Sequence, residues 1–379
     1  MKILFVLENY YPFIGGAEVL FKNLCEGLAE KGHDIIVLTT QLQGTLPDET
    51  INGVKIHRIS TPRKSSRYWF TFVAIPEALR LASSVDIVHT TTYNGAFPAW
   101  LSARIRGKKC IITILEIIGS GWKELSRMNW FSAMAHRFLE DIIISLRFDH
   151  FSAISRYTAG CLKTHGIDSD KISVIYPGIN YTLFDSSRAH GKPVRQKLNL
   201  EGVFIYLFFG RPGISKGVEY LVQAVPLINR VINNSKLLMI LAHEPSDGYD
   251  KITKLLKTLA IQDSVVLLDP VPRNILPDYI AAADCVIVPS LSEGFGFSAA
   301  EGCAMGKPVV ASNIASLPEV VSGVYTLVEP KDAPSIARAV EQVYNRQFIS
   351  HEKKMFLWAS CISAYEEVYH QLISKQGNG

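Results

Sequence analysis

Residues 285–312 read CVIVPSLSEGFGFSAAEGCAMGKPVVAS. The apolar runs at the two ends are typical of buried strands, and the small residues between them predict a turn that opens a helix near Phe297–Ser298. Because strand, helix and strand follow one another closely, the stretch predicts two parallel strands joined by a right-handed crossover. Two carboxylates, Glu293 and Glu301, flank the turn.

The same alternation of short apolar runs and longer helical patterns continues along the chain, with a polar interruption at residues 186–202. Strands are expected at residues 2–7, 34–40, 54–59, 86–92, 110–115, 150–155, 172–177, 204–210, 236–242, 264–269, 285–290 and 308–312. The pattern predicts an α/β protein with two Rossmann-like, doubly wound domains facing a cleft. We assign the N-terminal domain to residues 1–185 and the C-terminal domain to residues 186–354. The amphipathic helix at about residues 355–379 is expected to pack back on the first domain.

The 379-residue chain carries a net charge of +4 and six cysteines, none of them in a CxxC pair. This usage favours a reducing compartment and argues against a disulfide framework or a zinc site. The N-terminus lacks a signal-peptide cleavage pattern, and no apolar run reaches the ~18 residues of a membrane span, so we expect a cytoplasmic protein. No nucleic-acid-binding motif is present, and nucleic acid is not expected as a partner.

Two glycine-containing loops that follow strands are suited to bind phosphate. Gly15 and Gly16 precede an expected helix, whose N-terminus favours an anion, although a simple tight turn explains these glycines equally well. Arg211 and Lys216 flank the turn after the strand at 204–210. Two cations beside a helix N-terminus make a site for a diphosphate, with two solvated loop cations as the alternative.

The turn between Glu293 and Glu301 points to recognition of hydroxyl groups. With a helix that begins near Phe297, the first helical amides and those of the turn point toward the cleft. Carboxylates would repel phosphate, so they are better suited to accept hydrogen bonds from ribose or sugar hydroxyls. The alternative places Glu301 on the solvated surface of the helix.

Together these features resemble the retaining glycosyltransferases of family 4, which have the GT-B architecture. The resemblance rests on the loop GGAE (15–18), VIYPGIN (174–180), FFGRPGISKG (208–217), the E-x7-E stretch with GKPVVAS, and SLPEVVSG (316–323). It implies sugar transfer from a nucleoside-diphosphate sugar, with retention at the anomeric carbon. The sugar nucleotide is then a substrate, and neither a cofactor nor an essential metal is expected.

The resemblance also implies roles for individual residues. The catalytic residues that the resemblance implies are Glu293, Arg211 and Lys216. Glu293 would face the transferred sugar, and the two cations would stabilise the charge that develops on the diphosphate. Donor binding adds the backbone of Gly16 and a ribose contact from Glu301. The amides that would hold sugar and phosphate belong to Phe295, Gly296, Phe297 and Ser298.

Two loops depart from the family pattern. Family members commonly carry a histidine after the strand at 110–115, where it contacts the transferred sugar, but here Leu115 takes that place and Glu116 follows it. Either Glu116 supplies the polar contact, or sugar binding differs, or activity is reduced. The loop AHEPSDGYD (242–250) replaces a glycine-rich turn near the nucleotide base, so UDP-sugars and GDP-sugars both remain open as donors.

The first domain is expected to bind a glycan or lipid-linked acceptor. Residues 55–127 contain 12 basic and only 4 acidic residues. Basic residues alternate with aromatic ones in PRKSSRYWFTF (62–72), which holds Arg63, Lys64, Arg67, Tyr68, Trp69 and Phe70, and in WKELSRMNWFSAMAHRF (122–138). Such a surface suits peripheral contact with the inner face of the cytoplasmic membrane, as in polysaccharide or glycolipid synthesis. A solvated basic edge over core aromatics is the alternative.

Two other functions remain open. A sugar-nucleotide epimerase on the same architecture would isomerise the donor, and a non-catalytic relative would only bind it. The arrangement of Arg211, Lys216 and the two glutamates favours the transferase, whereas Leu115 favours the non-catalytic protein. The pair Asp168–Asp170 has the spacing of a metal site, but it lies in a connecting turn, so no metal is expected there.

Overall fold

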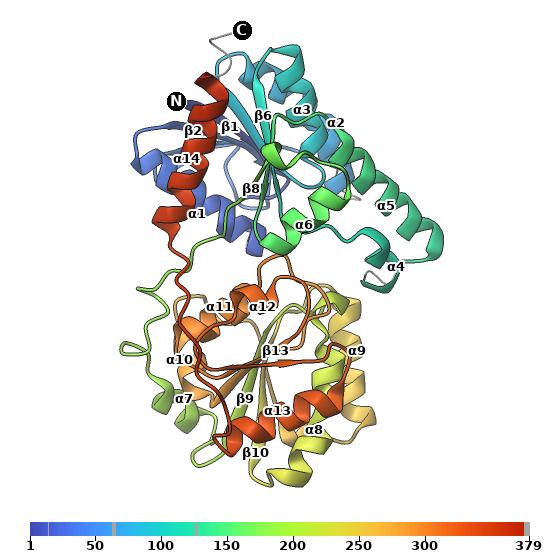
Figure 1. Ribbon diagram of the computed structural model, residues 1–379, viewed down its shortest axis with the longest axis vertical. Coiled ribbons are helices and arrows are strands. Elements are labelled where there is room, and N and C mark those ends of the chain that lie inside the picture. The colour runs from blue at the N-terminus through green and yellow to red at the C-terminus, as the bar shows by residue number, and fades with distance from the viewer. Residues whose placement is uncertain (14, 63–65, 126–127, 375–379) are drawn as a thin grey trace. The chain divides into compact units, whose positions relative to one another are not determined.

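Two sheets organise the chain in the computed structural model, which describes residues 1–13, 15–62, 66–125 and 128–374 (Figure 1). Unit 1 comprises Met1–Ser120, Met134–Gly178 and the C-terminal segment from Phe356. Unit 2 comprises Gly121–Ala133 and Ile179–Met355. The described residues contain no helix that is both long enough and apolar enough to cross a bilayer.

The sheet of unit 1 has the strand order β3-β4-β2-β1-β5-β6-β7-β8. Its strands are β1 (Lys2–Val6), β2 (Asp34–Thr40), β3 (Asp48–Ile51), β4 (Val54–Ile59), β5 (Ile87–Thr91), β6 (Lys109–Ile114), β7 (His150–Ala153) and β8 (Ile172–Val174). All neighbours pair in parallel except β3, which forms an antiparallel hairpin with β4. The strand order reverses between β1 and β5, which is the topological switch point of this sheet.

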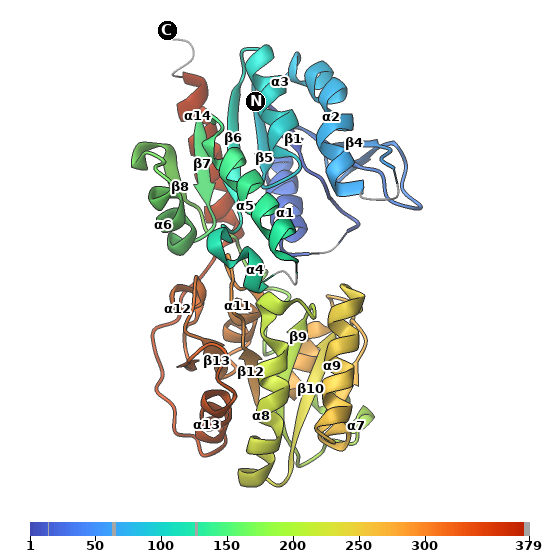
Figure 2. The same cartoon turned by 90° about the vertical axis from the view of Figure 1, so that its right-hand side faces the viewer.

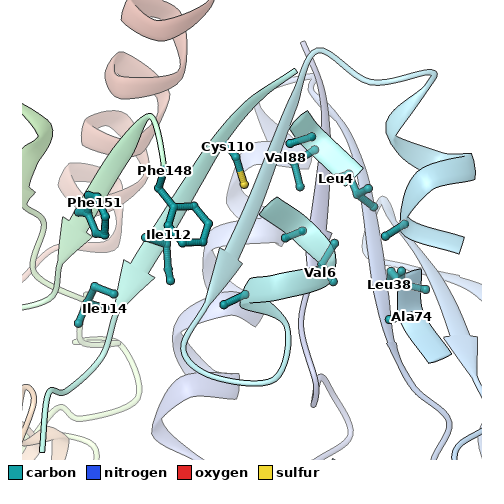
Figure 3. Packing of buried hydrophobic residues seen from close by; sticks show 14 of the residues in the cluster. Leu4, Val6, Leu38, Ala74, Val88, Cys110, Ile112, Ile114, Phe148 and Phe151 are labelled. Atoms are coloured by element: carbon teal, nitrogen blue, oxygen red, sulfur yellow. The ribbon is translucent and has the colours of Figure 1, made fainter. Parts of the chain in front are cut away.

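Helices cover both faces of this sheet (Figures 1 and 2). They are α1 (Gly16–Glu30), α2 (Ser66–Ala82), α3 (Ala96–Ile105), α5 (Trp130–Ser145), α6 (Arg156–Thr164) and α14 (Trp358–Ser374). Alternate residues of β1 face opposite ways. Leu4 and Val6 join the core under α2, α3 and α5 (Figure 3), whereas Phe5 packs against Phe21 of α1 on the other face.

A buried polar network holds α14 against this second face. His89 of β5 shares one hydrogen bond with the Tyr369 hydroxyl at 2.7 Å and another with the Thr113 hydroxyl at 2.8 Å. The Thr113 hydroxyl lies 2.9 Å from that of Tyr365. Burial lowers the pKa of His89 to about 3, so the ring is neutral at physiological pH. At the surface, Lys31 and His33 both contact Glu366 of α14.

The sheet of unit 2 is parallel, with the strand order β11-β10-β9-β12-β13-β14. Its strands are β9 (Phe204–Gly210), β10 (Ser235–Leu241), β11 (Val265–Leu268), β12 (Cys285–Val288), β13 (Val309–Ser312) and β14 (Tyr325–Val328). The helices of unit 2 are α4 (Trp122–Leu125), α7 (Gly191–Lys197), α8 (Val218–Val231), α9 (Ser246–Thr258), α10 (Leu276–Ala282), α11 (Phe297–Ala304), α12 (Leu317–Val320) and α13 (Ala333–Tyr344). The strand order reverses between β9 and β12, so a ligand is expected beyond the carboxyl ends of these two strands.

The structure confirms the predicted class of two Rossmann-like α/β domains, and each predicted strand is present with its ends shifted slightly. Two edge strands escaped prediction. β3 reads DETI, without a run of buried apolar residues, because only one of its edges pairs and its side chains remain largely accessible. β14 is a short edge strand that is mostly half-buried, so its apolar pattern is equally weak.

We expect Tyr369→Phe to lower the free energy of unfolding of unit 1 by about 1–3 kcal/mol, because it leaves a buried His89 nitrogen without its partner. Urea unfolding followed by tryptophan fluorescence would measure the change. Tyr344→Phe, at an exposed tyrosine of α13, is the matched control and should have little effect. Equal stability of Tyr369→Phe and the parent would contradict this account of how α14 is held.

Candidate active site

The loops after β9 and β12 meet at the switch point of the second sheet. Gly217 ends the loop after β9 and caps α8 with a positive φ of 60°. A Cβ at Gly217 would lie 2.0 Å from the Pro289 carbonyl oxygen, so only glycine fits there. The Leu291 amide donates a 2.6 Å hydrogen bond to the Ser215 carbonyl. Close backbone packing therefore fixes the two loops relative to each other.

This packing brings two of the predicted site residues into direct contact. The Lys216 ammonium donates a 2.6 Å hydrogen bond to Oε1 of Glu293, and the Ser290 hydroxyl donates another at 2.8 Å to the same oxygen. Glu293 is almost buried, whereas about a third of the Lys216 side chain is accessible. Arg211 lies at the end of β9 and is exposed. The cluster thus joins a buried carboxylate to one partly accessible cation, with Arg211 in the same loop as that cation.

The turn predicted between the two glutamates opens α11 at Phe297, as the sequence indicated. Gly296 caps the helix with φ of 94°, and a Cβ there would approach Leu317 of α12 to 2.7 Å. The Ser316 hydroxyl donates to the Glu293 carbonyl oxygen at 2.9 Å, which ties the turn to α12. Phe295 is buried and packs edge-on against Phe297. The turn is therefore held in place on its inner side.

Glu301 lies in α11 on its buried face, so the alternative of a solvated helix surface is wrong. Its carboxylate accepts a hydrogen bond from the Arg273 guanidinium. The same guanidinium stacks over the ring of Phe184 at 5.3 Å. Burial raises the pKa of the Glu301 carboxyl, and the positive charge of Arg273 opposes that rise. Glu301 is thus a buried carboxylate that is paired with the Arg273 guanidinium.

In unit 1, the first helix begins at Gly16, which is exposed and follows the N-cap Gly15. The buried Arg58 donates a 2.9 Å hydrogen bond to the Tyr11 carbonyl oxygen, and so anchors the loop that leads to this helix. At the switch point between β1 and β5, the Asn94 amide donates to a Glu8 carboxylate oxygen at 2.6 Å.

The loop after β6 carries Leu115 and Glu116, both half-buried. A buried carboxylate on α5, Glu140, holds this loop in place. It accepts hydrogen bonds from the backbone amides of Ile118 at 2.9 Å and Gly119 at 2.7 Å, and from the Tyr93 hydroxyl at 2.7 Å. Leu115 and Glu116 therefore lie on a loop whose backbone is hydrogen-bonded to the buried Glu140 carboxylate.

Neither acidic residue of the Asp168–Asp170 pair joins a metal-type cluster in the part of the chain that the structure describes. Asp168 caps a 3₁₀ turn (Ser169–Lys171) that contains Asp170, and Asp168 lies 3.9 Å from the Lys171 ammonium. Their location in a connecting turn agrees with the sequence interpretation.

The sequence analysis missed several side chains at these sites, among them Arg273, Ser290, Glu8 and Glu140. Arg273 follows β11 and Ser290 follows β12, so the rule that loops after strands carry function would have found both. Glu8 follows β1, so the same rule would have identified it as a candidate site residue. Glu140 gave no local signal, because it belongs to a helix and its partners lie about twenty or more positions away.

The chain is similar to known enzymes along most of its length. Family models match two stretches: Glycosyltransferase Family 4 over residues 14–183 and Glycosyl transferases group 1 over residues 204–346. An uncharacterised glycosyltransferase of Methanocaldococcus jannaschii is 28% identical over 93% of this chain and 93% of its own. A D-inositol 3-phosphate glycosyltransferase of Thermobifida fusca is 26% identical over 94% of this chain and 89% of its own.

Solved structures share the fold. Sucrose-phosphate synthase from Thermosynechococcus elongatus has a TM-score of 0.79 at 20% identity and covers 99% of this chain and 100% of its own. The Anabaena protein HepE in complex with UDP-glucose has a TM-score of 0.74 at 16% identity, over 100% and 99%. Fold and matches together define a glycosyltransferase with two Rossmann-like domains. The chain belongs to glycosyltransferase family 4, with the GT-B architecture.

We expect Arg273→Ala to lower the free energy of unfolding of unit 2 by about 1–3 kcal/mol at pH 7, because it leaves the Glu301 carboxylate buried without its cation. The raised pKa of Glu301 fixes the sign of the pH dependence. The stability that Glu301 contributes is fully present below the pKa that its carboxyl has in the unfolded chain. This contribution declines as the pH rises through the higher pKa of the folded state. The cost of Arg273→Ala should therefore shrink as pH falls from 7.5 toward ~4.5, the ordinary range of a glutamate.

The measurement is chemical unfolding of both proteins across this pH range. Arg273→Ala in a Glu301→Gln background is the matched control, since it loses the contact with Phe184 but leaves no buried charge. It should show a smaller cost that does not depend on pH. A pH-dependent cost that persists in this background would assign the effect to another group.

Proposed function

We propose that the protein transfers a sugar from a nucleoside-diphosphate donor to a glycan or lipid-linked acceptor, with retention at the anomeric carbon and without an essential metal. The observation that carries the proposal is the cluster at the switch point of the second sheet. There Lys216 pairs with Glu293, four residues before the start of α11, and the exposed Arg211 follows β9 in the same loop as Lys216. Cations, helical amides and a buried carboxylate are the groups that a sugar diphosphate requires.

The donor diphosphate is expected against Arg211 and Lys216. Arginine binds phosphate oxygens bidentately, and an ammonium on a flexible stem binds as a point charge. The amides of the first turn of α11 add a partial positive charge. Phe297 and Ser298 at the start of this helix are half-buried. The complex of the Anabaena relative with UDP-glucose supports a nucleotide sugar as the donor.

The two glutamates are expected to take the two sets of hydroxyls. Glu293 lies beside Lys216, which is expected to bind the diphosphate, and the transferred sugar is attached to that diphosphate. Glu301 is farther along α11, where it is buried and pairs with Arg273, and its carboxylate oxygens suit a ribose hydroxyl pair. The backbone of Gly16 and the amides of Phe295–Ser298 complete the donor contacts that the family resemblance implies.

Charge grows on the diphosphate oxygen as the glycosidic bond breaks. Lys216 and Arg211 stabilise that charge, and as accessible side chains they reach it without opening the fold. The carboxylate of Glu293, released from Lys216, accepts from a sugar hydroxyl and holds the ring near the leaving group. In this scheme, fixed protein charges perform the neutralisation for which other transferases use a metal.

The sugar pocket is expected to include Leu115 and Glu116 on the loop held by Glu140. An apolar side chain at 115 leaves a facing sugar hydroxyl unpaired, which favours a donor without that hydroxyl or a compensating contact from Glu116. For the acceptor, relatives named as inositol phosphate glycosyltransferases support a hydroxylated, anionic molecule. We place the reaction in polysaccharide or glycolipid synthesis at the inner face of the cytoplasmic membrane.

Lys216→Ala and Arg211→Ala should each weaken binding of UDP or GDP, whichever the parent prefers, by about 10- to 100-fold, because each removes a charge-assisted contact worth about 1.5–3 kcal/mol. Binding of the matching nucleoside should change far less. Isothermal titration measures both. Lys254→Ala, at an exposed lysine of α9, is the control and should bind like the parent. Unchanged diphosphate affinity in both variants would remove the assignment.

Transfer should proceed with retention and should survive EDTA, because the charges that stabilise the leaving group belong to the protein. A screen of UDP-, GDP- and ADP-sugars identifies the donor, and NMR of the fresh product reads the anomeric configuration. An inverted product, or activity that requires Mg²⁺ or Mn²⁺, would exclude the proposed mechanism. Isomerisation of the donor would indicate the epimerase, and binding without turnover would indicate the non-catalytic alternative.

A further inference from the structure

The outward face of α5 carries large apolar side chains that are exposed. Phe131 is 77% accessible, Phe138 65%, Met134 51% and Ile142 39%. A helix with one face on a core normally presents polar residues on the other. The inward face of α5 is already occupied, since Ala133, Glu140 and Ile144 are buried.

The spacing of these residues aligns them. Met134, Phe138 and Ile142 follow one another at intervals of four, which places them on one stripe of the helix surface. The stripe continues back to Trp130 in the first turn, which is 53% accessible. Large contiguous apolar patches of this kind mark interaction surfaces, whereas scattered exposed residues do not.

Helix α2 extends the same surface. Trp69 is 48% accessible and Phe72 62%, although Phe70 between them is completely buried. The Tyr68 hydroxyl of α2 lies 2.8 Å from Nε2 of His136 of α5, so side chains of the two helices are in contact at this point. Figure 2 shows both helices in the same domain. Of the aromatic residues predicted to face a membrane, Phe70 thus belongs to the core. Arg63 and Lys64 lie outside the described residues, and the Arg67 side chain is likewise not described.

Exposed arginines border the far ends of the two helices. Arg106 donates a 3.0 Å hydrogen bond to the Leu79 carbonyl oxygen near the end of α2, and Arg104 donates to the Arg147 carbonyl oxygen just past α5. The three arginines are exposed, and Ile105 between two of them is 59% accessible.

Two nearby carboxylates have cationic partners, whereas Asp141 of α5 is exposed and lies 3.6 Å from Nε2 of His165. Asp149 accepts a 3.1 Å hydrogen bond from Lys109, and Glu77 accepts one at 2.6 Å from Arg80. The apolar stripe is therefore bordered by basic groups whose charge these carboxylates do not neutralise.

We propose that this surface, formed by Trp69 and Phe72 of α2, by Met134, Phe138 and Ile142 of α5, and by Arg104, Arg106 and Arg147, docks on an anionic lipid bilayer. Aromatic and aliphatic side chains insert at the boundary between headgroups and acyl chains, while arginines bind lipid phosphates. Charge complementarity selects a bilayer over a neutral protein partner. The inference rests on the proposed function, because an enzyme that modifies a lipid-linked acceptor must reach the membrane surface.

The test is co-sedimentation of the full-length protein with vesicles of phosphatidylcholine alone and with added phosphatidylglycerol. The parent should bind the anionic vesicles, and Met134→Glu/Phe138→Glu should bind at least tenfold more weakly. Arg104→Gln/Arg106→Gln should lose about fivefold per arginine on anionic vesicles, and the loss should vanish at high salt. Val231→Glu, at a 52% accessible residue of α8, is the matched control and should bind like the parent.

Two outcomes would overturn the proposal. The parent fails to bind anionic vesicles, or Met134→Glu/Phe138→Glu binds them as the parent does. Light scattering tests the competing occupant, a second copy of the chain. If the parent is a dimer that does not bind vesicles, and Met134→Glu/Phe138→Glu is a monomer, the surface is a dimer interface. Affinity of each variant for the nucleotide, which is unit 2 chemistry, should stay at the parent value. Vesicle binding without turnover of any sugar nucleotide would reject the proposed function and leave the docking surface standing.

Discussion

In a parallel sheet the carboxyl ends of the strands lie at the same edge. Where the strand order reverses, the loops that follow two neighbouring strands run in opposite directions and leave room for a ligand between them. Both sheets of this protein use that constraint in the same way. A Cβ at Gly217 would lie 2.0 Å from the Pro289 carbonyl oxygen, and a Cβ at Gly95 would lie 2.5 Å from that of Val6. In each case the helix after one switch strand starts against the end of the other. The position of the site is therefore a consequence of sheet packing, and a larger residue at either glycine would displace the loops that carry the charged groups.

Three buried carboxylates lie at these edges. Glu140 accepts from two backbone amides and a tyrosine hydroxyl, which are fixed parts of the fold. Glu293 and Glu301 pair with Lys216 and Arg273, whose side chains are about one third accessible. A buried charge needs partners wherever it lies, but only accessible cations can change partner without unfolding. Glu140 is thus suited to hold a loop, whereas the other two carboxylates are suited to exchange contacts with a ligand.

The sequence was sufficient where a signal is local. Apolar runs marked each central strand, and the small residues of the turn indicated a helix start near Phe297–Ser298, where α11 begins at Phe297. It was insufficient where partners are far apart in the chain. The contact of His89 with Tyr369 joins positions 280 apart, and no periodicity announces it. Likewise, the pattern placed Lys216 and Glu293 in separate roles, because spacing along the chain does not reveal that two loops meet across a switch point. Exposure also had to come from the structure, since Trp69 and Phe70 are adjacent aromatics with opposite environments.

The contact between Lys216 and Glu293 has a consequence for the proposed donor. A diphosphate that takes Lys216 leaves Glu293 with the Ser290 hydroxyl as its remaining described side-chain donor, and the carboxylate is almost buried. An intact sugar nucleotide compensates, because a sugar hydroxyl can donate to the vacated oxygen while the phosphates hold the lysine. A nucleoside diphosphate without its sugar offers no such donor, so Glu293 competes with it for Lys216. Under the proposed function, one ion pair therefore couples recognition of the two halves of the donor, and it favours release of the product after the sugar has left.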